Sequence, residues 1–191
     1  MATMNFQAIR VGLDYSFERR KRENGRRRSL ALVLRSAAIR DLPELLRLEE
    51  LCFQEGRFRR GHLRWILRNP SAAAFVADTG HGLSGAIMLL FESRVCRIIS
   101  VAVVPAARRQ GLATNLMREA ERVGLARGCA VLRLEVSTAN LAAIELYRTL
   151  GYKSDGVLPR YYSWGEDAYA MSKAIAPSVL PPNREEPISI S

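Results

Sequence analysis

A strand, a basic turn and a long amphipathic helix follow one another between residues 100 and 127, and this succession constrains the fold more than any other stretch of the chain. The apolar run SVAVVP has the length of a strand and ends at Pro105. Apolar side chains then recur at the spacing of one helix face, at Leu112, Leu116, Ala120 and Val123. Gly128 is placed to end this helix. A strand that leads through a short turn into a helix is typical of an α/β fold.

The turn itself is suited to bind an anion. N–H groups and the positive end of the helix dipole meet at a helix N-terminus, Gly111 leaves room for close approach, and Arg108 and Arg109 add positive charge. The turn lacks the Gly-Lys-Ser/Thr of a Walker A loop and the GxGxxG of a dinucleotide site, which disfavours ATP and dinucleotides. The RxxGxA pattern of residues 108–113 therefore leaves two interpretations: a pyrophosphate cradle, or a helix start that follows a basic turn.

Hydrophobic periodicity gives the order of the other elements. We expect strands within residues 30–35, 72–78, 84–92, 96–105 and 130–136, and then two strands about a turn at Gly165. Helices are expected over residues 41–55, 60–67, 112–127 and 140–150, the first with Asp41 as N-cap and Pro43 just inside. The order β-α-α-β-β-β-α-β-α-β-β predicts an α/β sheet, classed as α+β in some schemes, with helices on both faces.

The first 29 residues differ in composition from the rest of the chain. Eight basic residues against three acidic ones give them half of the net charge of +10, and they show no periodicity. We therefore expect a basic arm at residues 1–29, a domain at residues 30–176 and a Pro-rich, loose tail at residues 177–191. The arm is a candidate for contact with a ribosome or nucleic acid; a solvated tail, a mis-assigned start and an organellar transit peptide are the alternatives.

Composition excludes several classes of protein. The apolar fraction of 48% suits an ordinary core. No apolar run reaches the roughly 18 residues of a membrane span, and the first thirty residues lack the apolar stretch of a secretory signal. Cys52, Cys96 and Cys129 show no CxxC spacing and lie apart from the two histidines, so neither a disulfide framework nor a metal site is expected. We expect a cytoplasmic protein with reduced, packed thiols and no contact with membranes.

A second pattern lies further along the chain, at residues 132–152, and reads LRLEVSTANLAAIELYRTLGY. It is separated from the basic turn by the expected helix and the start of the next expected strand. Together the two motifs resemble the GNAT superfamily of acetyltransferases, and in particular the bacterial ribosomal-protein alanine N-acetyltransferases. The resemblance covers about residues 30–173, and the loop departs from the commoner family pattern at Ala113, where glycine is more usual. It implies a GNAT-like mixed, mostly antiparallel central sheet, acetyl-CoA as co-substrate and no metal.

The resemblance also implies where the coenzyme binds. The strand before the loop would hydrogen-bond the pantetheine arm through the backbone of Val101, Ala102 and Val103. The loop would hold the pyrophosphate through Arg108, Arg109, Gln110, Gly111, Leu112, Ala113 and Thr114. Asn140, in the second motif, would also contact the coenzyme.

Transfer of an acetyl group to an amine needs one group that removes a proton from the amine and another that protonates the departing thiolate. No histidine is well placed, which leaves a carboxylate and a tyrosine. Glu135 interrupts an apolar strand, and Tyr147 lies two helical turns after Asn140 on the same helix face. The resemblance implies Glu135 as general base and Tyr147 as general acid. The residues alone also allow an interpretation without catalysis. Glu135 could face outward opposite Arg133 or Arg97, and Tyr147 could belong to the core.

The acceptor is the least constrained part of the prediction. By resemblance, residues 56–63 and the pair Tyr161 and Tyr162 would line the acceptor groove, with a packed hairpin as the alternative for the tyrosines. Arginines cluster between residues 57 and 68. They could favour an acidic acceptor or a ribosomal surface, or they could form a solvated helix face. We expect the N-terminus of a protein or peptide as acceptor. Within the same enzyme class, the alternative acceptor is a lysine side chain or a small amine. The alternative of a different class is a binding module that associates with ribosomes or nucleic acid and has a vestigial coenzyme pocket.

Overall fold

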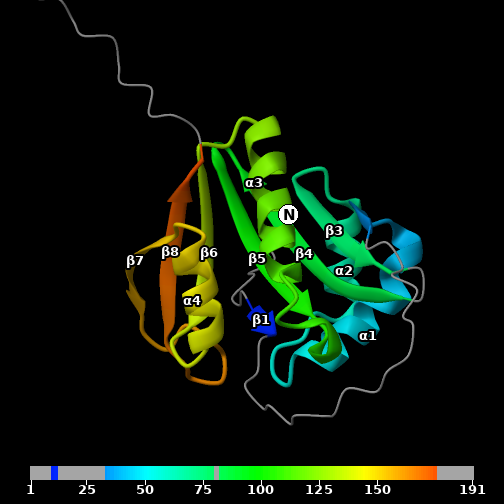
Figure 1. Cartoon of the computed structure of the whole chain (residues 1–191), viewed down its shortest axis with the longest axis horizontal. Coiled ribbons are helices and arrows are strands. Elements are labelled where there is room, and N and C mark those ends of the chain that lie inside the picture. The colour runs from blue at the N-terminus through cyan, green and yellow to red at the C-terminus, as the bar shows by residue number, and fades with distance from the viewer. Residues whose placement is uncertain (1–9, 13–32, 80–81, 176–191) are drawn as a thin grey trace, which may run out of the picture.

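The computed structural model describes residues 10–12, 33–79 and 82–175, which form a sheet with helices packed on it (Figure 1). The strands are β1 (Arg10–Gly12), β2 (Val33–Ser36), β3 (Ala72–Asp78), β4 (Leu83–Glu92), β5 (Val95–Val103), β6 (Val131–Ser137), β7 (Lys153–Leu158) and β8 (Ala168–Ala174). The helices are α1 (Leu42–Cys52), α2 (Arg60–Arg68), α3 (Leu112–Ala126) and α4 (Leu141–Thr149), with short 3-10 turns η1 (Ile39–Asp41) and η2 (Pro105–Ala107). From β2 onward this is the predicted order of helices and strands.

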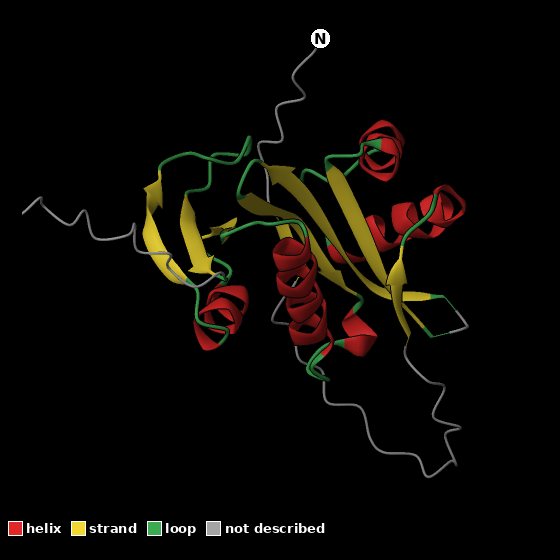
Figure 2. Cartoon of the chain, turned by 90° about the horizontal axis from the view of Figure 1, so that it is seen from above, coloured by secondary structure: helices red, strands yellow, loops and turns green. Residues whose placement is uncertain are grey.

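The strands form one sheet in the order β2-β3-β4-β5-β6-β8-β7, and β1 pairs with β5 beside this path. Neighbours pair antiparallel except in two cases, β5 with β6 and β1 with β5, which are parallel. Figure 2 shows α3 and α4 on one face of the sheet and α1 and α2 on the other. The predicted fold class, a mixed and mostly antiparallel sheet with helices on both faces, is therefore confirmed.

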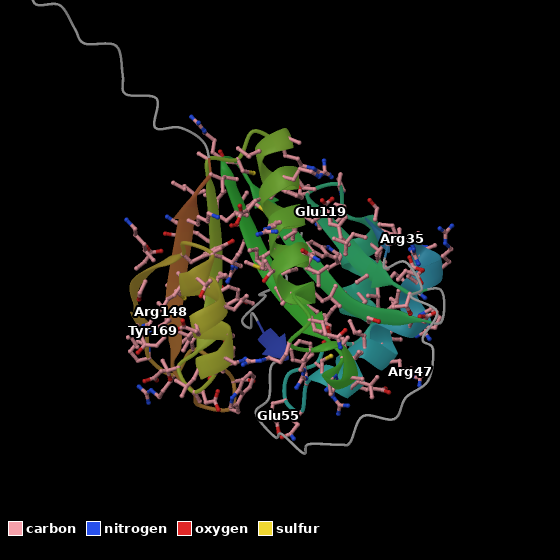
Figure 3. The ribbon with its side chains drawn as sticks, in the orientation of Figure 1. Arg35, Arg47, Glu55, Glu119, Arg148 and Tyr169 are labelled. Atoms are coloured by element: carbon pink, nitrogen blue, oxygen red, sulfur yellow. The ribbon has the colours of Figure 1, made fainter. Side chains whose placement is uncertain are left out.

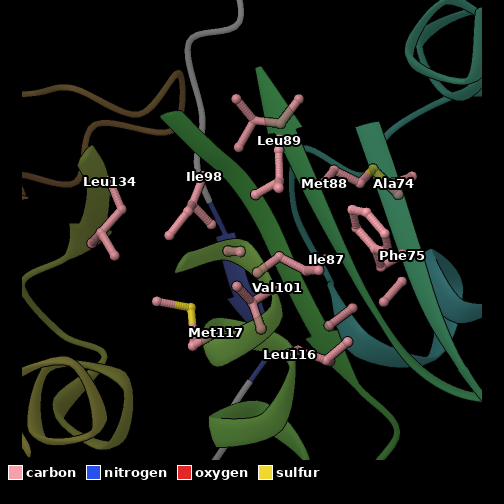
Figure 4. Close-up of a cluster of buried hydrophobic side chains, with 14 of the residues drawn as sticks. Ala74, Phe75, Ile87, Met88, Leu89, Ile98, Val101, Leu116, Met117 and Leu134 are labelled. Atoms are coloured by element: carbon pink, nitrogen blue, oxygen red, sulfur yellow. The ribbon is translucent and has the colours of Figure 1, made fainter. Parts of the chain in front are cut away.

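The core lies against the central strands. Figure 4 shows Leu116 and Met117 of α3 beside Ile87 of β4 and Val101 of β5, and all four side chains are buried. Burial of one such side chain stabilises the fold by about 1.5–3 kcal/mol relative to its exposure. These contacts hold α3, and with it the turn at its start, against the middle of the sheet.

The start of α1 differs from the prediction at Asp41, whose side chain does not cap the helix. Its carboxylate accepts hydrogen bonds from the Ala38 N–H at 2.7 Å and from the two Nη atoms of Arg35 at 2.8 and 2.9 Å. Arg35, labelled in Figure 3, also binds Asp78 at 2.9 Å. Its hydrogen bond to Asp41 is the main cause that lowers the pKa of that carboxyl. Arg35 therefore joins β2 and β3 to the start of α1 through Asp41, whose side chain does not cap the helix.

Two irregularities open the sheet at its centre. β5 pairs with β6 only over residues 95–97 against 131–133, and within the described residues β6 beyond Arg133 pairs only with β8. The pairing of β4 with β5 is also interrupted between Met88 and Leu89, and such a bulge bends a strand and increases its twist. Figure 1 shows β5 and β6 parting toward their carboxyl ends, with β1 between them. We call this gap the central opening.

β1 departs from the expectation that all of residues 1–29 lie outside the fold. Arg10, Val11 and Gly12 pair in parallel with Ser100, Val101 and Ala102 of β5. A strand of three residues carries no recognisable periodicity, which is why the sequence did not indicate it. The rest of the predicted arm, and the predicted tail at residues 177–191, lie outside the described residues.

The close contact between α3 and the sheet depends on Gly85 of β4. A Cβ atom at this position would lie 2.8 Å from the Ala102 carbonyl oxygen and 3.3 Å from the side chains of Leu112 and Leu116. The first distance is shorter than real Cβ contacts allow, and its partner is backbone. Glycine at position 85 therefore lets the first turn of α3 rest directly on β4 and β5.

We expect Gly85→Ala to lower the free energy of unfolding by about 1–3 kcal/mol, because overpacking forces the backbone to shift. Gly61→Ala is the matched control: a Cβ there meets no heavy atom within 4 Å, and alanine is favoured over glycine inside a helix such as α2. Urea unfolding of both variants measures the difference. Equal stabilities would contradict the close contact described for Gly85.

Candidate active site

The turn into α3 lies at the carboxyl end of β5, beside the central opening. Gly111 is the N-cap of α3, with a φ of 77°, a left-handed conformation that glycine adopts without strain. The first helical hydrogen bond runs from the Asn115 N–H to the Gly111 carbonyl at 3.0 Å. The N–H groups of the first helical turn precede this bond and have no helical carbonyl to bind, so an anion can accept from them. They belong to Leu112, Ala113 and Thr114.

The polar side chains of this turn stabilise the turn itself. Arg108 Nε donates to the Val103 carbonyl at 3.1 Å, and Gln110 Nε2 donates to the Ala106 carbonyl at 3.1 Å. Arg109 has a φ of 62°, which is unfavourable for a residue with a side chain. The predicted loop residues thus form one compact turn, whose donors are backbone amides at the start of a helix.

The strand before the turn is paired along both edges. On one edge Val101, Ala102 and Val103 pair with β4, and their side chains are buried. On the other edge β1 pairs with Ser100, Val101 and Ala102. The backbone that the resemblance assigns to the pantetheine arm is therefore the backbone to which β1 is bound, over two of its three residues.

Glu135 lies on β6, on the face opposite to the buried side chains of Leu134 and Val136. Its Oε2 atom accepts hydrogen bonds from Arg97, at 3.0 Å from Nη2 and 3.4 Å from Nε. The side chains of Glu135 and Arg97 are 14% and 23% exposed, so the ion pair is partly shielded from water. Of the two arginines that the sequence left open as neighbours, Arg97 is the one that pairs with Glu135.

Tyr161 joins the same cluster from the loop between β7 and β8. Its hydroxyl accepts a hydrogen bond from Arg97 Nη2 at 2.9 Å, and its ring contacts Tyr162 edge-on at 5.3 Å. Burial, and next the negative charge of Glu135, raise the pKa of Tyr161 to about 12. Tyr162 is buried and stacks on Trp164 at 4.5 Å. The sequence pointed to the two tyrosines and left Arg97 open as a partner of Glu135, but it did not single out Trp164.

Tyr147 on α4 is fully buried, with its ring 5.6 Å from that of Tyr152. Burial, and to a smaller extent Tyr162, raise the pKa of Tyr147, so the phenol keeps its proton near neutral pH. Its hydroxyl has no hydrogen-bond partner among the described residues. A buried hydroxyl left unpaired costs about 1–3 kcal/mol. The ring of Tyr147 is thus part of the core, while its hydroxyl oxygen is buried without a hydrogen-bond partner among the described residues.

Asn140 has a structural role that the sequence motif did not reveal. It is the N-cap of α4, and its Oδ1 atom accepts a hydrogen bond from the Ala143 N–H at 3.1 Å. Caps of this kind stabilise a helix by about 1 kcal/mol. Asn140 thereby fixes the start of the helix that carries Tyr147, and its contact with a coenzyme stays a prediction.

A buried carboxylate anchors the loop after α1, which the resemblance assigns to the acceptor groove. Glu49 is buried, and its Oε2 atom accepts a hydrogen bond from the Phe58 N–H at 2.9 Å. Figure 3 shows Glu55, in the same loop, at the end of the molecule where β1 also lies. Glu49 was not among the residues predicted from the sequence, although its position four residues after Leu45 places it on the buried stripe of α1.

The three cysteines are free, and burial is the main cause that raises the pKa of Cys52 to about 11 and that of Cys96 to about 12. These two thiols therefore stay protonated and weakly nucleophilic near neutral pH. In the part of the chain that the structure describes, no three His, Cys, Asp or Glu side chains are grouped as metal ligands. None of the helices within residues 33–79 and 82–175 has the length and apolar character needed to cross a bilayer.

Comparison with known sequences assigns the chain to a family. The sequence pattern of the Acetyltransferase (GNAT) family matches residues 39–152. The chain is 34% identical over 148 residues to the N-terminal acetyltransferase A complex catalytic subunit NAA10 of Arabidopsis thaliana, a match that covers 74% of this chain and 77% of that protein. It is 31% identical over 160 residues to an N-alpha-acetyltransferase of Saccharolobus solfataricus, over 75% of this chain and 93% of that protein.

Solved structures agree with this assignment. The ribosomal-protein-S18-alanine N-acetyltransferase from Escherichia coli has a TM-score of 0.71 and 25% identity, over 79% of this chain and 99% of its own. NAA60 of Arabidopsis thaliana, solved in complex with acetyl-CoA, has a TM-score of 0.69 at 18% identity over 76% of this chain and 99% of its own, a likeness of fold alone. Because the family pattern spans more than half of the sequence, the chain belongs to the GNAT family of acetyltransferases.

Proposed function

We propose that this chain transfers the acetyl group of acetyl-CoA to the α-amine of a protein N-terminus. One observation carries the proposal: the chain has both a partly shielded carboxylate, Glu135, held by Arg97 beside Tyr161, and a buried hydroxyl, that of Tyr147, without a hydrogen-bond partner among the described residues. Tyr161 packs on Tyr162, whose charge is the smaller cause, after burial, of the raised pKa of Tyr147. A base and an acid of this kind are what aminolysis of a thioester requires.

Three features of the chain fit acetyl-CoA as the co-substrate. The first-turn amides of α3 suit a pyrophosphate, and a Cβ atom at Gly111 would meet no heavy atom within 4 Å, so the turn is open in front. The unpaired Tyr147 hydroxyl suits the sulfur of the thioester. The edge of β5 that β1 occupies would offer its backbone groups to the amides of a pantetheine arm when β1 is displaced.

The proposed residues account for each proton of the reaction. The ammonium of the acceptor gives one proton to Glu135, which releases it to water; the neutral nitrogen then attacks the thioester carbon, so that a C–N bond forms and the C–S bond breaks. The nitrogen gives its second proton to the Glu135 carboxylate as the amide forms. The departing thiolate takes the proton of Tyr147, whose raised pKa keeps it available, and the phenolate regains a proton from Glu135 through water. Arg97 holds Oε2 of Glu135, so we assign Oε1 to the amine. Direct attack needs no acyl-cysteine, in keeping with the protonated thiols of Cys52 and Cys96.

The relatives support an α-amine over a lysine or a small amine. The Arabidopsis and Saccharolobus proteins are named as N-terminal and N-alpha-acetyltransferases, and the Escherichia coli enzyme as acting on an alanine of ribosomal protein S18. We assign the walls of the acceptor groove to Tyr161, Tyr162 and the loop anchored by Glu49. Exposed arginines stand on and just before α2, and they favour an acidic acceptor: Arg57, Arg59, Arg60 and Arg64.

Three further expectations stay predictions. Contact with a ribosome or nucleic acid would involve basic residues of which most lie outside the described residues, and the names of the relatives point to protein acceptors instead. A cytoplasmic location and the domain limits at residues 30 and 176 likewise await a test.

The acceptor is tested with peptides. We expect acetylation of the α-amine when the protein is incubated with acetyl-CoA and lysine-free peptides of different N-termini, the faster ones with acidic residues near the start. An N-blocked peptide with one lysine is the control, and mass spectrometry maps the modified atom. Transfer to the lysine peptide alone, or to no peptide, would show that the proposed acceptor is wrong.

The acid and base are tested by substitution. Glu135→Gln and Tyr147→Phe should each lower kcat by about 10²–10⁴, the usual contribution of general acid–base catalysis. Tyr147→Phe should leave the melting temperature unchanged or higher, because it removes an unpaired buried hydroxyl.

Two matched controls accompany these variants. Tyr152→Phe removes the neighbouring buried hydroxyl that also lacks a partner among the described residues, and Glu92→Gln removes the exposed carboxylate at the end of β4. Both should keep kcat within about threefold, as expected for groups outside the proton transfers. Full activity of Glu135→Gln and Tyr147→Phe would refute the assigned roles.

β1 and a pantetheine arm cannot pair with the same backbone of β5 at the same time. A chain that lacks residues 1–29 should therefore bind acetyl-CoA about two- to tenfold more tightly, the equivalent of about one backbone hydrogen bond. A chain that lacks residues 177–191 is the control and should bind as the full chain does. Titration calorimetry measures both, and unchanged affinity without the arm would contradict the competition.

A further inference from the structure

Arg97 occupies the last position at which β5 pairs with β6, opposite Arg133. From there its Nη2 atom reaches Oε2 of Glu135 at 3.0 Å and the Tyr161 hydroxyl at 2.9 Å. A strand, the neighbouring strand and the loop between β7 and β8 therefore meet at one guanidinium. Any amine that gives its proton to Glu135 comes within a few ångströms of this positive charge.

Other charges around the pair are few. Arg133 is on the same face of β6 as Glu135, but it is exposed and forms no ion pair among the described side chains. Glu92, at the end of β4, acts on Arg97 only through its charge. β8 presents Ala170 and Ser172 opposite Glu135 and Arg133, and the phenols of Tyr147 and Tyr161 are neutral near pH 7. The side chains of β1 are not described. Among the side chains that the structure describes, Arg97 is thus the cation in direct contact with the proposed base.

The sign of this charge matters for the acceptor. An α-amine has a pKa of about 7.7–8.0 and a lysine side chain about 10.4, so at pH 7 roughly one α-amine in ten but only about one lysine in 2,500 is neutral. A carboxylate alone would stabilise an ammonium of either kind. A fixed guanidinium beside the carboxylate cancels much of that stabilisation. Burial alone would lower the pKa of Arg97, but the charges of Glu135, Tyr161 and Glu92 and the hydrogen bond to Glu135 together raise it, so Arg97 keeps its proton.

We propose that Arg97 is a further functional residue of the site, whose positive charge disfavours the ammonium form of the bound acceptor and so eases the loss of its proton to Glu135. The inference rests on the proposed function, since it needs an amine next to Glu135. It differs from a positioning role, in which the guanidinium would only hold the Glu135 carboxylate in place. A positioning role predicts the same loss of rate at every pH, and a charge effect predicts a displaced pH profile.

The test compares the full chain with Arg97→Gln, Arg97→Lys and Arg133→Gln, after thermal melts confirm folding. The pH dependence of kcat is measured at saturating lysine-free peptide, because kcat reports ionisation in the bound complex. Without the guanidinium charge the bound amine is more basic, so the rising limb of kcat for Arg97→Gln should move to higher pH by about 0.5–1 unit. Arg97→Lys, which keeps the charge, should keep the midpoint, and Arg133→Gln should also keep it.

A uniform loss of kcat in Arg97→Gln, with the midpoint of the pH profile preserved, would overturn the proposal in favour of positioning alone.

A measurement on the unmutated chain keeps the proposal testable if Arg97→Gln does not fold. Two peptides that differ only in alanine or 3-fluoroalanine at the first position have amines of similar shape, and the fluorinated amine is less basic. The midpoint of kcat should move to lower pH with the fluorinated peptide. An unchanged midpoint would assign the titration to the enzyme and overturn the inference. Failure of the unmutated chain to acetylate any α-amine would instead refute the proposed function itself.

Discussion

The parallel pairing of β5 with β6 stops after three residues, and the rest of the site depends on this early end. Beyond it the inner edge of β5 has N–H and C=O groups that β6 no longer satisfies, and such groups need partners wherever water is excluded. The same divergence leaves room for Arg97, Glu135 and Tyr161 to meet on one face. A sheet with β5 and β6 paired to their ends would have neither the edge of β5 that β1 occupies nor the cluster.

Rigid packing surrounds this opening and sets the geometry of the groups that face it. Gly85 lets α3 rest on β4 and β5, so the amides at the start of α3 are held at a fixed place relative to the strand before them. Asn140 caps the helix that carries Tyr147, and Glu49 anchors the loop after α1 from within. Contacts inside the fold thus fix the positions of the first-turn amides of α3, of Tyr147 and of the loop after α1. Catalysis requires reacting groups to be held in such a fixed geometry.

The sequence predicted most of the fold and part of the site. The strand Ala72–Asp78 and the start of α3 were located to the residue, because an apolar run between a proline and a turn, and a glycine before an amphipathic stretch, are strong local signals. Asp41 was placed correctly along the chain but given the wrong partner, since a carboxylate before a helix can bond forward to the helix or back to Ala38. The contact of Arg97 with Tyr161, and the three-residue strand β1, depend on segments distant in sequence and left no local pattern.

The attachment of β1 to the inner edge of β5 has a consequence for any ligand that needs that edge. Because β1 and β5 belong to one chain, with about twenty residues between Gly12 and Val33, β1 competes at an effective concentration set by the tether, on the order of millimolar, and dilution of the protein does not weaken it. A ligand then binds with its intrinsic affinity reduced by the fraction of molecules in which the edge is free. Whatever holds the first residues of the chain elsewhere would raise that fraction, and so would tune the occupancy of the site without touching any residue that lines it.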